Sequence, residues 1–223
     1  MPRMVFIGFL IAVATLVGCA SATQERTTTI PMDKQGCCQV VEATPRRTAI
    51  VRTATQLVGA TTIDVHGRRI AYDCAGVTRA IFLDHGIDLY DSGVSDPTAN
   101  GVRLIYAHMR QHGALHHGPV AHPGDLVFFN NTWDYNRDGK ANDLLTHVGI
   151  VERQEPDGTV VFISRVAGAV ERYHMNLALP HVHKTTGGRI LNDYLRRKDI
   201  LDPANTDYLT GELFTQFATQ ALH

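Results

Sequence analysis

The chain of 223 residues is poor in cysteine and carries almost no net charge. Four cysteines are too few for a disulfide scaffold in a chain of this length. A formal net charge of -1, without a clustered basic stripe, gives no reason to expect a nucleic-acid partner. Hydrophobic residues make up 44% and charged residues 19%, which is ordinary for a soluble globular protein. The length allows one well-buried domain together with some additional segments.

Long apolar runs are also scarce, and the one that stands out lies at residues 5–17. It is shorter than a bilayer-spanning helix requires, so it predicts the hydrophobic part of a secretory signal; a plain membrane anchor is the alternative. The run ends in "LVGC", Leu16–Cys19, which resembles the lipobox of bacterial lipoproteins. The resemblance implies a signal peptide at residues 1–18, cleavage before Cys19 and membrane attachment through lipid on that cysteine. Because Ala20 follows it, the resemblance further implies the outer membrane, facing the periplasm.

The remaining chain divides by composition into three parts. Residues 19–45 are polar, rich in threonine and without an apolar period, which predicts a flexible tether. Cys37 and Cys38 within it form a vicinal disulfide or are incidental, and no catalytic role is assigned to them. Residues 46–185 show helical patterns first and extended apolar segments afterwards, which predicts an α+β domain with antiparallel strands. Residues 186–223 carry apolar side chains at helical spacing, which predicts a helical C-terminal extension.

Cys74 stands where a helix is predicted to begin, directly after Asp73, a good N-cap residue. The positive end of the helix dipole lowers the pKa of such a thiol and favours the nucleophilic thiolate. A nucleophilic thiol also needs a base, and His147 opens a predicted strand later in the chain. The alternative is a buried structural cysteine without chemistry.

Three blocks of sequence together resemble the NlpC family of bacterial cell-wall cysteine endopeptidases. They are "YDCAGV" from Tyr72, "HPGDLVFF" from His122 and "THVGIV" from Thr146, within roughly residues 49–169. CHAP amidases share this arrangement and are the closest competing family. The resemblance implies a papain-like fold, with the Cys74 nucleophile on a helix and the His147 base on a small antiparallel sheet. The family's third polar position, usually histidine, falls on Ser164.

Together with the lipobox, this resemblance implies a lipid-anchored cysteine hydrolase that cleaves amide or peptide bonds in the peptide stems of peptidoglycan and requires no cofactor. The alternative is an envelope lipoprotein that binds wall peptides in the same cleft and does not cleave them.

The segment "DYNRDGKAND" has the oxygen-ligand spacing of an EF-hand-like calcium loop. The usual glutamate at the twelfth position is replaced by Leu145, so two later polar residues would complete the ligand shell. A polar surface loop is the alternative, and a calcium-dependent structural lipoprotein is a third functional hypothesis. The predicted Ca²⁺ ligands are Asp134, Asn136, Asp138, Lys140, Asn142 and Asp143.

Two other groups of polar residues are predicted to be structural. The histidines at 108, 112, 116 and 117 have the spacing of zinc ligands, but Gly113 interrupts the helix and no carboxylate or cysteine joins them. A solvated helix face is therefore expected for them. Asp125 is expected to be a turn residue that caps the start of a strand.

Overall fold

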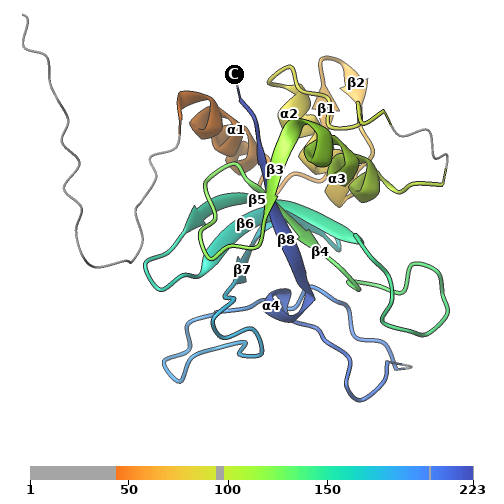
Figure 1. Ribbon diagram of the computed structural model, residues 1–223, viewed down its shortest axis with the longest axis vertical. Helices are drawn as coiled ribbons and strands as arrows, with labels where there is room; N and C mark the ends of the chain where they lie inside the picture. Colours follow the sequence, from red (N-terminus) through yellow and green to blue (C-terminus); the bar gives the residue numbers. More distant parts are fainter. Residues whose placement is uncertain (1–43, 94–97, 201, 223) are drawn as a thin grey trace, which may run out of the picture. The chain divides into compact units, whose positions relative to one another are not determined.

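The computed structural model describes residues 44–93, 98–200 and 202–222, and these form a mixed α+β structure around one large sheet (Figure 1). The sheet has six strands, all paired antiparallel, in the order β3-β8-β4-β5-β6-β7. The α+β class predicted from the sequence is confirmed. The predicted signal peptide, Cys19, Cys37 and Cys38 lie outside the described residues. The strands are β3 (Gly113–His116), β4 (Leu126–Phe129), β5 (His147–Gln154), β6 (Val160–Val166), β7 (Ala169–Met175) and β8 (Phe214–Gln220).

Each of the three long helices begins where a polar side chain can cap it. The side chains of Thr44, Asp73 and Asn100 accept hydrogen bonds from backbone N–H groups in the first turns of α1, α2 and α3. The helical segments are α1 (Pro45–Gln56), α2 (Cys74–Leu83), α3 (Gly101–His112) and the short α4 (Thr210–Leu213). A small hairpin of β1 (Asp64–Val65) and β2 (Arg68–Arg69) precedes α2.

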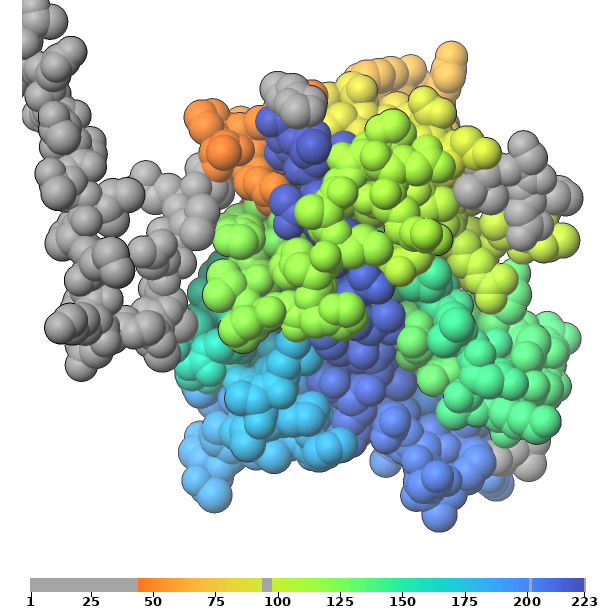
Figure 2. All heavy atoms as spheres, viewed as in Figure 1, coloured from red at the N-terminus to blue at the C-terminus, as the bar shows by residue number. Residues whose placement is uncertain are grey.

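The central strands are buried on both faces. Leu126 and Phe128 pack in one cluster with the apolar sides of α1, α2 and α3. Val127 and Phe129, the alternate residues of the same strand, pack in a second cluster with Leu213. Successive side chains of a strand point to opposite faces of the sheet. Because both faces are buried here, all four residues of β4 are apolar. The three helices thus cover one face of the sheet, and the C-terminal region covers the other (Figure 1 and Figure 2).

The helical extension predicted for residues 186–223 is wrong. Only α4 is an α-helix in the described part of this region, and β8 lies inside the sheet, paired with β3 on one side and β4 on the other. Phe217 and Ala218 are fully buried, one in each apolar cluster. Pairing on both edges and burial on both faces outweigh the helical spacing of the apolar residues.

Among the described helices, none combines the length and apolar character needed to cross a bilayer.

Candidate functional site

Cys74 is the first residue of α2, and the local backbone fixes its position tightly. The Asp73 carboxylate accepts the Gly76 N–H at 2.7 Å, which caps the helix as the sequence predicted. Gly76 has no alternative here, because a Cβ atom would lie 1.9 Å from the Ala71 carbonyl oxygen. The half-buried thiol is therefore held at the helix start, against the apolar cluster between the helices and the sheet.

The thiol faces the first residues of β5. The backbone N–H of Val148 interacts with the Cys74 thiol and favours its thiolate form. Val148 directly follows His147, which opens β5 as the sequence predicted. The structure therefore brings the helix start and the beginning of this strand together, although His147 stands 73 positions after Cys74 in the sequence.

Ser164 fixes the orientation of the His147 ring. Its Oγ lies 2.8 Å from His147 Nε2 and donates a hydrogen bond to the Val148 carbonyl oxygen at 2.7 Å. A hydroxyl has one hydrogen, so Ser164 must accept from Nε2–H. His147 is then the Nε2–H tautomer, and its Nδ1 keeps a lone pair. All three residues of this network are buried or nearly so, which limits rotation of the imidazole.

Burial dominates the electrostatics of the site. It raises the pKa of Cys74 to about 11, assisted by the negative charge of Asp73 and opposed by backbone N–H groups. It lowers the pKa of His147 to about 3, assisted by the positive charge of Arg165. The expectation of a thiol pKa lowered by the helix start is therefore wrong for this structure. At neutral pH both side chains are therefore uncharged, a thiol and a neutral imidazole.

Two residues that received no role in the sequence analysis also belong to this environment. Arg165 follows Ser164 on β6, and its guanidinium carbon lies 5.0 Å from the centre of the Tyr72 ring. Tyr72 donates a hydrogen bond to the Ala60 carbonyl. The Arg165 Nε is buried and has no hydrogen-bond partner among the described residues. The proximity of the Arg165 charge to the His147 imidazole depends on how the strands pair, so local sequence could not predict it.

The predicted calcium ligands fold around one turn between β4 and β5. Asp134 accepts hydrogen bonds from the N–H groups of Asp138 and Gly139, at 3.1 and 2.8 Å. Asp138 accepts from the Asn142 side chain at 2.9 Å and from the Lys140 N–H at 2.9 Å. Within the described residues, no three His, Cys, Asp or Glu side chains are grouped to hold a metal ion. An ion in this loop would therefore depend on amide and backbone oxygens as well as on carboxylates.

One carboxylate of this loop is buried. Asp143 is 4% exposed, and its Oδ1 accepts the N–H of Asn136 at 3.3 Å, so the carboxylate faces the loop. Its Oδ2 has no hydrogen-bond partner in the described structure. A buried carboxylate oxygen without a partner is unfavourable, and a bound cation would relieve that cost.

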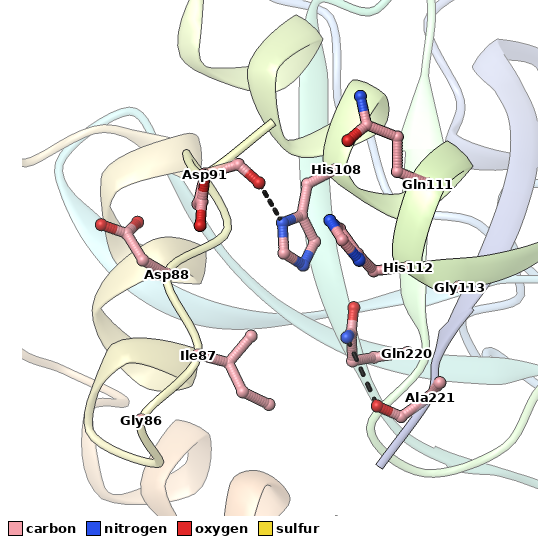
Figure 3. Close-up of a pocket in the computed structure, with 10 residues that line it drawn as sticks. All are labelled: Gly86, Ile87, Asp88, Asp91, His108, Gln111, His112, Gly113, Gln220 and Ala221. Atoms are coloured by element: carbon pink, nitrogen blue, oxygen red, sulfur yellow. Dashed lines mark hydrogen bonds between the residues drawn. The ribbon is translucent and has the colours of Figure 1, made fainter. Parts of the chain in front are cut away.

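The four histidines that were expected on a solvated face have different environments. His108 is only 6% exposed, so the expectation is wrong for it. It lines a cavity of about 610 Å³ near the end of α3 (Figure 3). His112 and His117 are exposed, and His116 Nε2 lies 3.5 Å from Asp125. His108 is buried because the turn of α3 that carries it packs against the segment that follows α2.

Asp125 has a wider role than the predicted strand cap. It does accept the His122 N–H at 2.8 Å, as a turn residue would. Its fully buried carboxylate also accepts hydrogen bonds from Arg47 and Thr219, each at 2.8 Å. It therefore ties α1 and β8 to the start of β4.

No family model matches the sequence, and no curated protein matches it.

Proposed function

We propose that this chain is a papain-like cysteine hydrolase that cleaves amide or peptide bonds in the peptide stems of peptidoglycan. The observation that carries the proposal is the buried network of His147, Ser164 and the Val148 carbonyl, next to a thiol at a helix start. A neutral imidazole with its Nε2–H held by a hydroxyl and its Nδ1 lone pair available has the form of a general base. The family resemblance of the three sequence blocks supplies the substrate class.

The proposed reaction starts from the neutral pair. As the Cys74 sulfur attacks a carbonyl carbon, its proton passes to His147 Nδ1, so no free thiolate has to accumulate. The backbone N–H groups at the start of α2 stabilise the oxyanion. The imidazolium then gives its proton to the leaving amine, which leaves a thioester on Cys74. Water, deprotonated by His147, hydrolyses the thioester and restores the thiol.

Ser164 and Arg165 affect the proposed base in different ways: Ser164 orients its ring, and Arg165 affects its protonation. Ser164 accepts from Nε2–H in both protonation states of the ring, so it holds the orientation throughout. Arg165 disfavours the imidazolium electrostatically. In the proposed reaction a substrate carboxylate would offset this charge, and stem peptides of the wall contain such groups. Binding of the correct peptide would then be coupled to a stronger base.

The proposed location is the cell envelope, with the protein attached to the outer membrane through lipid on Cys19 and facing the periplasm. This location depends on the lipobox resemblance. It places the hydrolase next to its proposed substrate.

We also propose that the loop between β4 and β5 binds Ca²⁺ as a structural ion. The support is the buried Asp143 Oδ2 without a partner, together with a set of oxygen groups at Asp134, Asn136, Asp138 and Asn142. Hard oxygen ligands of this kind suit Ca²⁺. The loop ends shortly before His147, so the ion would stiffen the approach to the proposed base.

An alternative function is binding of wall peptides without cleavage. The raised pKa of Cys74 and the lowered pKa of His147 favour it, because they make the resting pair less reactive than a thiolate–imidazolium pair.

Digestion of purified sacculi by the soluble part of the chain, with products identified by mass, tests the proposal. We expect wild type to release peptide fragments, and Cys74→Ala and His147→Ala to release none. His117→Ala is the matched control, because this exposed histidine lies away from the site and its loss should leave digestion unchanged. If wild type releases no fragment but is retained on sacculi, the binding function replaces the enzyme. Equal digestion by wild type and Cys74→Ala would remove Cys74 from the mechanism.

A further inference from the structure

A second candidate site lies in the cavity of about 610 Å³ near the end of α3 (Figure 3). The cavity is bordered by the segment after α2, the last turn of α3 and the end of β8. Neither Cys74 nor His147 is among the residues that line it. It is therefore separate from the proposed hydrolase site, and nothing in the proposed reaction uses it.

His108 presents a free lone pair to this cavity. Its Nδ1 lies 2.8 Å from the backbone carbonyl oxygen of Asp91, and a carbonyl can only accept, so Nδ1 carries the proton. Nε2 then has a lone pair, and it is buried with no hydrogen-bond partner in the described structure. A histidine whose second ring nitrogen donates to a backbone carbonyl is the usual arrangement of a metal-binding histidine.

Gln220 presents a second buried acceptor from the opposite wall. Its side-chain N–H donates to the Ala221 carbonyl oxygen at 3.4 Å, while Oε1 is buried and has no partner among the described groups. Leaving a buried acceptor unpaired costs about 1–3 kcal/mol. Two such acceptors at one cavity indicate an occupant that donates hydrogen bonds or accepts electron pairs.

His112 completes the arrangement. It stands four residues after His108 on α3, so the two side chains share one face of the helix. The ring centres are 4.7 Å apart. In Figure 3 the two imidazoles and the Gln220 amide face a common space. His112 is exposed, so an ion can reach this space from solvent.

We propose that His108 Nε2, the His112 imidazole and Gln220 Oε1 bind one divalent transition-metal ion of the zinc type. Two imidazoles favour Zn²⁺, Ni²⁺ or Cu²⁺ over Ca²⁺ or Mg²⁺, which prefer oxygen ligands. Water completes the coordination. The ion joins the last turn of α3 to the end of β8 and so acts as a structural clasp between segments more than 100 residues apart in sequence.

Titration of the purified chain with Co²⁺, followed by Zn²⁺ displacement, tests this site. Visible absorption reports Co²⁺ binding to imidazole, and a near-ultraviolet thiolate band reports binding to cysteine. We expect one Co²⁺ per chain without the thiolate band. We expect His112→Gln to weaken binding about tenfold or more, because a direct ligand is lost. His117→Gln is the matched control and should bind as wild type does.

A second variant tests whether Gln220 is a metal ligand, and it replaces the side chain instead of removing it. Gln220→Glu places a carboxylate where the amide oxygen lies, so Co²⁺ should bind about tenfold more tightly. Unchanged or weaker binding by this variant would remove Gln220 from the ligand set. A strong thiolate band, or equal binding by wild type and His112→Gln, would overturn the site altogether. None of these results depends on whether the chain cleaves peptidoglycan.

Discussion

The neutral state of His147 predicts how the stability of the protein depends on pH. Burial and the Arg165 charge lower the pKa of His147 from 6.5 in the unfolded chain to about 3 in the folded protein. Below pH 6.5 the unfolded chain therefore binds a proton that the folded protein does not. The free energy of unfolding then falls as the pH is lowered from 6.5 towards 3.

The size of the effect follows from the two pKa values. Between pH 7 and pH 5 a single histidine with this shift removes about 2 kcal/mol from the free energy of unfolding. Carboxylates with lowered pKa values, such as Asp88 and Glu152, contribute mainly below about pH 5, since their ordinary values are near 4. The window from pH 7 to pH 5 is thus suited to isolating the histidine.

Urea denaturation of wild type and His147→Gln at pH 5, 6 and 7 measures this effect. The variant is expected to be less stable at pH 7, since it loses part of the contact with Ser164. Between pH 7 and pH 5, however, its free energy of unfolding should fall by about 2 kcal/mol less than that of wild type. His117→Gln, which alters an exposed histidine, should follow wild type. Parallel curves for wild type and His147→Gln would refute the assignment of a buried neutral imidazole.

Four further outcomes are expected. Alkylation of Cys74 by iodoacetamide should be slow at pH 7 and accelerate up to about pH 11, and fast alkylation at pH 6 would contradict a raised pKa. Ser164→Ala should reduce kcat for sacculus digestion with little change in KM, and Ser164→Thr should restore part of the rate, as kinetics of fragment release would show. In a thermal melt, Ca²⁺ at about 100 times its Kd should stabilise the fold by about 2.7 kcal/mol. Asp143→Asn should abolish this stabilisation, and Mg²⁺ should not produce it in wild type. Gly76→Ala should destabilise the protein by about 2–4 kcal/mol in urea, because the new Cβ meets the Ala71 carbonyl.

The sequence predicted those parts of the fold that depend on local signals. The cap at Asp73 predicted the start of α2, and His147 was correctly predicted to open a strand, which is β5. β8 was missed because "FTQFATQ" from Phe214 has no clear alternation. Its strand conformation comes from the two neighbouring strands that pair with it.

In the candidate site, too, local sequence predicted some features, and others depend on distant segments. Short motifs selected Cys74, His147 and Ser164, and the contacts of Ser164 with the ring and of the thiol with Val148 show that these residues share one environment. The direction of the two pKa shifts could not be predicted, because it depends on burial that distant segments provide. The same is true of His108, whose burial by the segment after α2 has no counterpart in the spacing of the histidines.

The position of β8 has a consequence for the order in which the molecule can be assembled. β3 and β4 are not paired with each other, and the strand that joins them is synthesised roughly 90 residues later. Until residue 220 has left the ribosome, β4 presents an open edge and β3 has no strand partner in the sheet. Closure of the sheet is therefore a long-range step, slow by its topology, and the open edge of β4 is exposed to pairing with other chains in the meantime. Loss of a few residues from this last strand would divide the sheet through its interior and not merely trim its border.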